Sequence, residues 1–222
     1  MATAASVVAV VGMRSEARLL PPGIRAVVAG GDPRRLAALL AAEPGEVAAV
    51  LSFGIAGGLD PALGAGDLVV ATRVRGPRGA WRADLGWAAA LARATGARLG
   101  VVAGAAVVVA EPAAKRNLRS ATDALAVDLE SEAAAAFAAS RGLPFVALRA
   151  IADTAEEVLP RAAAVGLTAD GRPAPGRVAL ALLRRPGDLP ALVQVARRTR
   201  EALAALERAA KALPASAPSA AR

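Results

Sequence analysis

Apolar runs of strand length alternate with helix-like segments along most of the chain. The runs are rich in β-branched and small apolar residues, which fits strands buried on both faces of a sheet. They cover residues 6–11, 24–29, 47–53, 68–74, 99–110 (interrupted at Gly104) and 145–151. Helical segments are predicted from about residue 14, and at 33–42, 85–95, 133–140, 177–184 and 189–213, and residues 115–125 are expected to form a helix or a mix of loop and helix. The alternation predicts an α/β fold, a three-layer αβα sandwich with helices on both faces of a largely parallel or mixed sheet.

The remaining segments indicate one domain. No internal repeat or separating linker is present, so residues 1–213 are expected to form a single domain and residues 214–222 a disordered tail. A loop is expected at 75–82 and a short strand-like piece at 165–167. Residues 54–58 contain three glycines, which let the backbone approach a ligand or a neighbouring segment closely. Their spacing matches neither the Walker nor the GxGxxG pattern.

The composition excludes several kinds of chemistry. The 222 residues include no Cys and no His. This excludes disulfides, thiolate metal sites, Ser-His-Asp catalysis and His-ligated zinc. Acid–base chemistry must therefore come from Asp or Glu, with Lys as a distant candidate. We expect no metal and no resident cofactor.

The net charge of +8 would suit nucleic acid or an anionic membrane. However, nearly all the basic residues are Arg in a chain rich in Ala, Gly and Pro, which is typical of a high-GC genome. Only 2% of residues are aromatic, so stacking platforms for bases are scarce. We therefore expect no nucleic-acid partner and at most peripheral membrane contact. No apolar run reaches the ~20 residues of a membrane span, and the N-terminus lacks a signal peptide's basic region, so a cytoplasmic location is expected.

Three carboxylates stand at strand ends or helix starts. Asp153 closes the last predicted strand, Glu130 precedes the alanine-rich helix, and Glu16 lies in the first turn of the helix after the first strand. Ligands of open α/β sheets bind at the carboxyl ends of the strands, so Glu130 and Asp153 could face one crevice. Two such acids can divide acid and base roles, a logic that also applies to an N-glycosidic bond. The simpler interpretation of Glu16 is a charge that favours a helix N-terminus.

Four short segments occur in a recognisable order. They are residues 11–16 (VGMRSE), 52–59 (SFGIAGGL) followed by 66–70 (GDLVV), 127–131 (VDLES) and 144–153 (PFVALRAIAD). As a set they resemble the purine nucleoside phosphorylase and nucleosidase superfamily, in particular the methylthioadenosine/S-adenosylhomocysteine (MTA/SAH) nucleosidases. The chain is most similar to the hopanoid-associated branch, because of its shortness and the sequences Gly-Gly-Asp-Pro at 30–33 and Arg-Arg-Pro at 184–186. The resemblance implies a partly barrel-like central sheet and a homodimer or higher homo-oligomer.

The resemblance also implies a role for four side chains. Asp153 would be the general acid toward purine N7, which makes the base a neutral leaving group. Glu130 would hold the ribose 2′- and 3′-hydroxyls, and Leu129 stands against the sugar where the nucleosidases usually have Met. Glu16 would activate the attacking water, a step that a phosphorylase does not need because phosphate is already a nucleophile.

Two departures from the family pattern bear on the nucleophile. The phosphorylases bind phosphate with an Arg and a Ser on the third strand, and Ser52 and Ile55 occupy those places here. This favours hydrolysis, although Arg34 and Arg35 could build another anion site. The second departure is Ala152, which replaces a Ser that would orient Asp153.

The resemblance implies cleavage of the N-ribosidic bond of an adenine nucleoside. The hopanoid-like features predict adenosylhopane as substrate, giving adenine and ribosylhopane, with the lipid leaving past Trp81 and Trp87. These two tryptophans would otherwise be ordinary packing residues. The alternatives are phosphorolysis of a purine nucleoside with inorganic phosphate as co-substrate, MTA/SAH nucleosidase activity, or non-catalytic nucleoside binding.

Overall fold

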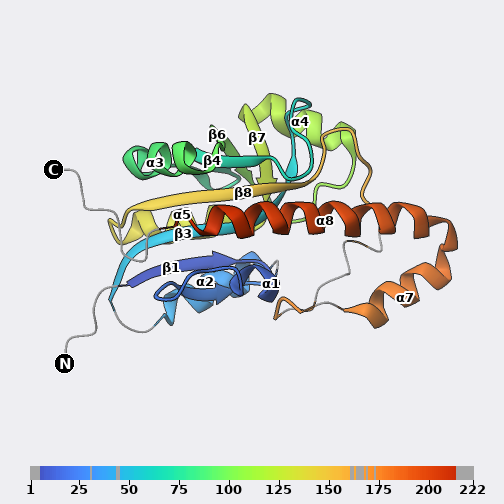
Figure 1. The fold of residues 1–222 in the computed structure, drawn as a ribbon, viewed down its shortest axis with the longest axis horizontal. Helices are drawn as coiled ribbons and strands as arrows, with labels where there is room; N and C mark the ends of the chain where they lie inside the picture. Colours follow the sequence, from blue (N-terminus) through green and yellow to red (C-terminus); the bar gives the residue numbers. More distant parts are fainter. Residues whose placement is uncertain are drawn as a thin grey trace.

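The structure, a computed structural model, describes residues 6–30, 32–43, 46–160, 163, 168, 170–172 and 174–213. Within them, eight strands form one sheet: β1 (Ser6–Val11), β2 (Arg25–Val28), β3 (Val47–Gly58), β4 (Leu68–Gly76), β5 (Gly79–Arg82), β6 (Arg98–Gly104), β7 (Ala124–Asp128) and β8 (Phe145–Asp153). The helical segments are α1 (Arg14–Ala17), α2 (Pro33–Ala41), α3 (Leu85–Thr95), α4 (Pro112–Thr122), α5 (Ser131–Ser140), α7 (Pro175–Arg184), the 3₁₀ turn η1 (Pro186–Asp188) and α8 (Leu189–Ala210). Figure 1 shows their arrangement.

Five of the strands close into a barrel-like ring. β3 pairs with β7, β7 with β6, β6 with β4 and β4 with β8, which pairs back with β3. β1 and β2 extend the sheet beyond β3 in parallel, and β5 adds an antiparallel edge to β4. The ring confirms the expected α/β fold with a mixed, partly barrel-like sheet.

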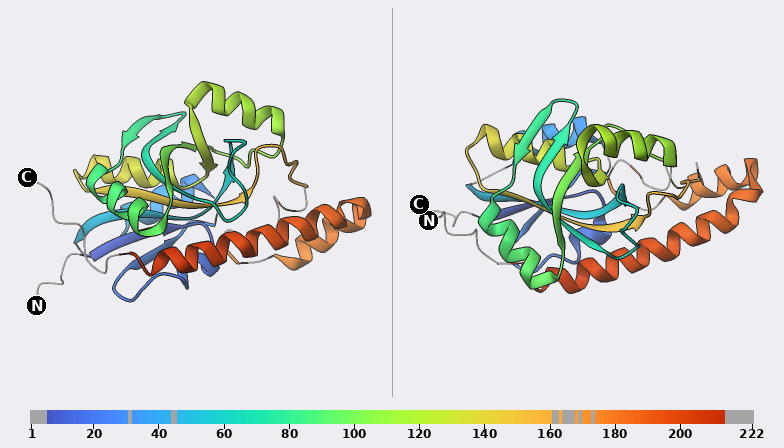
Figure 2. Two further views of the ribbon diagram at one scale, coloured as in Figure 1. Left: turned by 45° about the horizontal axis from the view of Figure 1, so that its top comes forward. Right: turned by 90° about the horizontal axis from the view of Figure 1, so that it is seen from above.

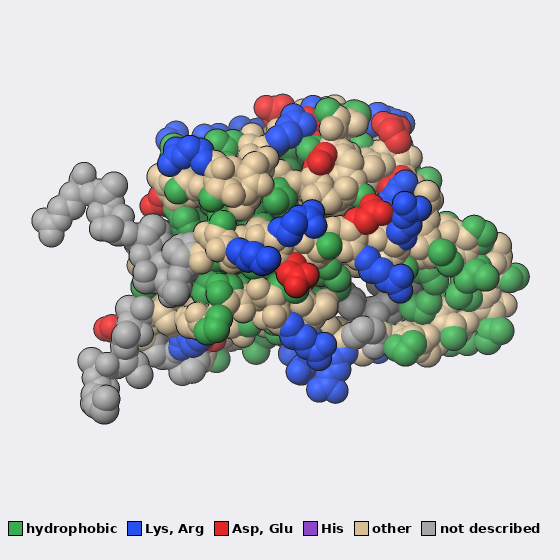
Figure 3. Space-filling model, viewed as in Figure 1, with side chains coloured by type: hydrophobic (Ala, Val, Ile, Leu, Met, Phe, Trp, Pro, Cys, Tyr) green, Lys and Arg blue, Asp and Glu red, His purple; other side chains and the backbone are tan. Residues whose placement is uncertain are grey.

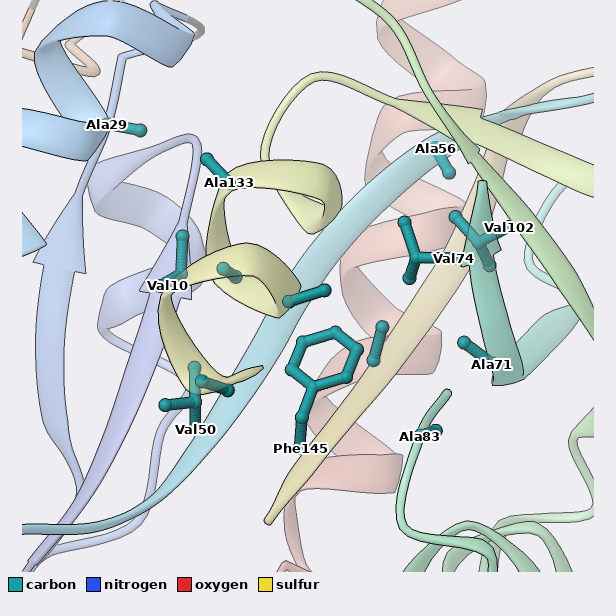
Figure 4. Packing of buried hydrophobic residues seen from close by; sticks show 14 of the residues in the cluster. Val10, Ala29, Val50, Ala56, Ala71, Val74, Ala83, Val102, Ala133 and Phe145 are labelled. Carbon is teal, nitrogen blue, oxygen red and sulfur yellow. The ribbon is translucent and has the colours of Figure 1, made fainter. Parts of the chain in front are cut away.

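Helices cover the sheet on both sides, as the sequence predicted (Figures 1 and 2). α2 and α5 share one core cluster with the strands, and α3 and α8 share another. The alanines of α5 are mostly buried, and their small side chains let this helix lie close to Val50 of β3 and Phe145 of β8 (Figure 4). The three layers bring the carboxyl ends of β1, β3 and β8 to one side of the molecule.

The structure corrects the predicted loop at 75–82. These residues complete β4 and form β5. The two strands pair as a tight hairpin, in which Gly76 is opposite Gly79 at the turn and Arg73 is opposite Arg82 at the far end. Its charged side chains and glycines obscured the strands because one face of the hairpin is open to solvent.

The predicted helix at 115–125 was also partly wrong. Helix α4 stops at Thr122 because Asp123 adopts a left-handed conformation (φ 55°). The chain then forms β7, a strand that the sequence analysis missed. β3 is longer than predicted and runs through the glycines to Gly58, whereas the strand predicted at 99–110 ends at Gly104. The strand-like piece at 165–167 and the tail at 214–222 lie outside the described residues.

One observation bears on membrane insertion. Across the described ranges, no helix has both the length and the apolar character needed to cross a membrane.

Candidate active site

A cavity of about 190 Å³ opens where β1, β3, β7 and β8 end. It brings together all the site residues predicted from the sequence, since Glu16, Leu129, Glu130 and Asp153 all line it. The other lining residues are Gly12, Met13, Ile55, Ala56, Gly57, Val107, Val108, Val109, Val127, Asp128, Ala152 and Leu159. The lining that the structure describes therefore contains four carboxylates and no Arg or Lys.

Glu16 is a buried carboxylate held by backbone N–H groups. Its Oε2 accepts hydrogen bonds from Gly12 (2.9 Å) and Met13 (2.8 Å), and its Oε1 accepts one from Ile55 (2.8 Å). The bond to Met13 caps α1, so the helix-start interpretation of Glu16 is correct and compatible with a place in the cavity. Burial raises the pKa of Glu16, and the three N–H donors and the charge of Arg149 oppose that shift.

Glu130 stands at the N-cap of α5, directly after β7. The neighbouring Asp128 shapes this turn, because its Oδ1 accepts the N–H groups of Glu130 (3.2 Å) and Ser131 (2.9 Å). Burial raises the pKa of Glu130 to about 8, with repulsion from Asp128 and Glu16 adding to the shift and Arg149 opposing it. At pH 7 Glu130 is therefore mostly protonated, and can both donate to and accept from a diol.

Arg149 lies beneath these acids and is fully buried in the middle of β8. Its Nε forms an ion pair with Asp128 Oδ2 (2.5 Å), and its Nη1 lies 3.9 Å from Glu130 Oε2. Its Nη2 donates to the hydroxyls of Ser52 and Ser131. One guanidinium thus balances part of the negative charge of the cavity floor.

Asp153 ends β8 on the opposite part of the cavity wall. A register shift between β3 and β8 lies next to it, and pairs Gly57 with Asp153 after Ala56 with Ile151. Such a bulge re-aims a side chain at a strand end. Lys115 of α4, fully buried, places its Nζ 2.5 Å from Asp153 Oδ2. Burial raises the pKa of Asp153, and Lys115, with a smaller contribution from Arg198, opposes the rise.

Each of the three acids faces a glycine. A Cβ on Gly12 would lie 2.9 Å from Glu130 Oε1, and one on Gly54 would lie 2.6 Å from Glu16 Oε1. A Cβ on Gly57 would lie 3.1 Å from Asp153 Oδ2. Gly54 and Gly57, both in the glycine-rich stretch 54–58, therefore leave space for the carboxyl groups of Glu16 and Asp153. This is a close approach of the kind that the glycines predicted.

The structure also bears on the tryptophans that were considered as an apolar wall and on the arginines that were considered as an anion site. Neither tryptophan lines the cavity: Trp87 is a buried residue of α3 in one core cluster, and Trp81 packs against the other core cluster. The apolar-wall hypothesis for Trp81 and Trp87 is therefore wrong, and the packing interpretation is correct. The guanidinium of Arg35 donates to the carbonyls of Val28 and Ala29, and its side chain does not line the cavity. The side chain of Arg34 lies outside the described part of the chain.

Sequence analysis did not assign roles to Arg149, Asp128 or Lys115. The first two lie within the matching segments, but their mutual ion pair depends on the pairing of both β7 and β8 with β3. Lys115 had no local signal, since it lies in a polar helix beside Arg116 and only the tertiary structure buries it. A Lys is rarely buried without a partner. The burial of Lys115 could therefore not be predicted without knowing that Asp153 lies next to it in the fold.

The comparisons with known proteins agree with this geometry. A family model described as the Phosphorylase superfamily matches residues 19–184. The chain belongs to this superfamily. Membership confirms the expected superfamily and the expectation of an enzyme, while the narrower hopanoid-associated branch stays a prediction. A comparison with curated protein sequences gave no match.

Solved structures of other superfamily proteins share the fold. The 5′-methylthioadenosine/S-adenosylhomocysteine nucleosidase of Streptococcus pneumoniae is 17% identical (TM-score 0.64), covering 94% of this chain and 100% of that one. A point mutant of the Helicobacter pylori MTAN, with 5′-methylthioadenosine in its active site, is 18% identical (TM-score 0.63; 95% and 100%). A futalosine hydrolase mutant from the same species is 20% identical (TM-score 0.59; 69% and 90%).

We predict that Gly54→Ala will remove most activity while the chain still folds. The added methyl group would meet Glu16 Oε1 and lie 2.7 Å from Arg149 Nη1, so both groups must move. Overpacking of this kind costs about 1–3 kcal/mol. Activity and urea denaturation should be measured beside Gly176→Ala, where a Cβ meets nothing within 4 Å. Wild-type activity in Gly54→Ala would show that this contact does not position Glu16.

Proposed function

We propose that this phosphorylase superfamily member hydrolyses the N-ribosidic bond of an adenine nucleoside. The observation that carries the proposal is the cavity lining, which holds Glu16, Asp128, Glu130 and Asp153 and, among the described residues, no cationic side chain. A carboxylic acid can protonate a leaving base, and carboxylates can bind a diol and activate water, which are the three tasks of this reaction. Two of the similar solved structures are nucleosidases of adenine compounds, which supports an adenine nucleoside as substrate.

Asp153 has the properties of the general acid. Its burial raises its pKa, so that a larger fraction carries a proton near neutral pH than for an exposed Asp. Proton transfer from Asp153 to purine N7 would let the base depart as a neutral molecule while the ribosyl carbon gains positive charge. The Asp153 carboxylate left behind would lie beside Lys115.

Glu16 is suited to receive a proton from water. An ionised carboxylate has about four acceptor positions, and three backbone N–H groups occupy three of them. One position therefore remains for a water molecule at the cavity floor. Burial makes Glu16 a stronger base than an exposed Glu, while the N–H donors and Arg149 keep the ionised form accessible, as the opposing effects on its pKa indicate.

Glu130 and Leu129 lie beside each other at the turn between β7 and α5. A protonated Glu130 can donate to one ribose hydroxyl and accept from the other. Leu129 adds an apolar surface next to this carboxyl group. The proposed ribose position is thus between Glu130 and Leu129, within reach of both the base side and the water side of the cavity.

The same charges disfavour phosphate as the nucleophile. A phosphate beside Glu16 would also lie near the carboxyl group of Asp128, and Arg149 is the cation that the described residues place beneath this part of the cavity. Two of the guanidinium nitrogens of Arg149 are already bound to Asp128, Ser52 and Ser131. Repulsion between buried like charges is strong where water is excluded, so water is the favoured nucleophile.

The mouth of the cavity favours an apolar substituent on the sugar. Val107, Val108 and Leu159 line it, and Val107 and Val108 are 72% and 41% exposed. Exposed apolar side chains at a cavity mouth would be covered by an apolar ligand group. Adenosylhopane, cleaved to adenine and ribosylhopane, fits this requirement, and its lipid would pass the valines rather than the two tryptophans. Methylthioadenosine has a smaller apolar group and is the alternative substrate.

Adenine release with and without phosphate tests the function. Purified protein should release adenine from adenosylhopane, or from 5′-methylthioadenosine, at the same rate in phosphate-free buffer and in added phosphate. Asp153→Asn, which preserves shape but cannot donate this proton, should lower turnover by about 10²–10⁴-fold. Its folding should be verified by circular dichroism.

Each contrary result has a distinct meaning. Strict dependence on phosphate would contradict hydrolysis. Tight binding of adenine compounds without any release of base would instead support a non-catalytic nucleoside-binding protein. Unimpaired turnover by Asp153→Asn would refute the role of Asp153.

A further inference from the structure

The buried ammonium group of Lys115 donates a hydrogen bond to Asp153, the proposed proton donor. Lys115 has no exposed surface, and its three N–H donors go to Asp153 Oδ2 (2.5 Å), the carbonyl of Thr154 (2.6 Å) and the carbonyl of Glu157 (3.1 Å). The ammonium group is therefore saturated and has no donor left for a substrate. Ala152, the neighbour of Asp153, has only a methyl side chain and cannot orient the carboxyl group.

We propose that Lys115 is a positioning residue for Asp153, which fixes its Oδ2 and stabilises the carboxylate that remains after proton transfer. This inference rests on the proposed function. With Oδ2 bound by Lys115, Oδ1 has no hydrogen-bond donor among the described residues and is the oxygen that faces the base. In the step itself a proton leaves Oδ1 for purine N7, the carboxyl group becomes a carboxylate, and Lys115 keeps its positive charge throughout.

The ammonium group of Lys115 also holds the segment that follows β8, through its hydrogen bonds to the carbonyls of Thr154 and Glu157. Glu157, whose carbonyl Lys115 binds, accepts the N–H of Thr154 (2.8 Å) through Oε2 and forms an ion pair with Arg198 of α8. Leu159, in the cavity wall, donates its N–H to the carbonyl of Ala110 (3.0 Å). Lys115 therefore couples the orientation of Asp153 to the segment that forms one wall of the cavity.

The charge of Lys115 has a predictable effect on the pH profile. Asp153 acts in its protonated form, so activity falls as pH rises through the pKa of this group. Burial raises this pKa and Lys115 lowers it. Removing the ammonium charge should therefore move the alkaline limb of the kcat/KM profile to higher pH. It should also lower kcat, because a weaker acid transfers its proton less readily.

The test compares Lys115→Met and Lys115→Gln with the wild type, using the phosphate-free adenine-release assay from about pH 5 to 10, a range that spans the shifted carboxyl groups. Gln keeps donors for the two carbonyls, so it separates the loss of charge from the loss of packing. Both variants should show a lower kcat, with KM changed less, and an alkaline limb at higher pH. Arg116→Met is the matched control, because Arg116 is the next residue in α4, lies at the surface and pairs with Glu156 (3.5 Å) rather than with the cavity.

The outcomes are distinguishable from a failure of the proposed function. An inactive wild type would refute the function itself. An active wild type with an unmoved alkaline limb in both variants would refute the role of Lys115. Unfolding of both variants, or folded variants inactive at every pH, would also contradict it, since Lys115 would then act as a general structural residue.

A different observation concerns the end of the molecule formed by α7 and the first turns of α8. No described side chain of α7 is buried, and four large apolar side chains in this region are exposed: Leu180 (52%), Leu183 (81%), Leu189 (52%) and Val193 (61%). We call these four residues the apolar tip. Figures 1 and 2 show α7 and the start of α8 extending beyond the sheet, and Figure 3 shows hydrophobic side chains gathered over that end.

Charged residues around the apolar tip are mostly cationic. Residues 175–193 contain three arginines, Arg177, Arg184 and Arg185, all exposed, against one acid, Asp188. Exposed leucines combined with arginines on short helices are typical of segments that lie in the interface of an anionic bilayer. We infer that the apolar tip docks on anionic lipid membranes, with the leucines at the acyl boundary and the arginines at the headgroups. This inference does not depend on the reaction that the protein catalyses.

Vesicle sedimentation tests the membrane inference. The protein should sediment with vesicles of equal parts phosphatidylcholine and phosphatidylglycerol, and much less with phosphatidylcholine alone. The double variant Leu180→Asp/Leu183→Asp should lose the anionic-lipid component. Leu85→Asp, at an exposed leucine on α3 (58%), is the control and should bind as the wild type does.

Two results would overturn the membrane inference. One is sedimentation that the double variant leaves unchanged, or no sedimentation of the wild type. The other is a wild-type dimer that the same double substitution converts into a monomer, because the apolar tip would then be an interface between two copies of this chain.

Discussion

The candidate active site depends on one buried guanidinium, that of Arg149. A buried charge without a partner costs several kcal/mol, and several carboxylates in one cavity would repel each other. Arg149 forms an ion pair with Asp128 and lies near Glu130 and Glu16, while the hydroxyls of two serines accept hydrogen bonds from its Nη2. The partners come from β3, α1 and the β7–α5 turn, so the same interaction joins separate segments and assembles the acids. Ser52 of β3 belongs to this network.

Three similar carboxyl groups have different neighbours, and the roles proposed for them follow from these differences. Glu16 is surrounded by N–H donors, which support its ionised form beside a free acceptor position. Glu130 lies among other acids and keeps its proton, which suits a ribose diol. Burial raises the pKa of Asp153 and the adjacent ammonium group of Lys115 opposes this rise, so that in the proposed reaction Asp153 can hold a proton and its carboxylate is stabilised after transfer. Environments that separate the proton affinities of like groups are how one cavity can contain both an acid and a base.

Much of this arrangement could be predicted from the sequence because its signals are local. The valine-rich β1, the capped α3 and the buried β8 have periodicity and boundaries that a single sequence shows. Glu130 and Asp153 were placed at one crevice because ligands bind at the carboxyl ends of the strands in an α/β sheet, whereas Glu16 was added by the family resemblance of residues 11–16. The missing parts depend on contacts distant in sequence. β7 is a five-residue strand directly after a helix, and the ring closes through the β3–β7 and β4–β8 pairings. The contact between Lys115 and Asp153 becomes apparent only when α4 is placed next to the end of β8.

The identity of the nucleophile tests this account most directly. The reaction should be run in ¹⁸O-labelled water that also contains inorganic phosphate, and the first ribosyl product analysed by mass spectrometry. The account predicts a free ribosyl product with one ¹⁸O atom at its anomeric carbon and no sugar phosphate, because a water molecule beside Glu16 attacks that carbon. An unlabelled ribosyl 1-phosphate would show that phosphate enters the cavity despite its four carboxylates, and would contradict the account.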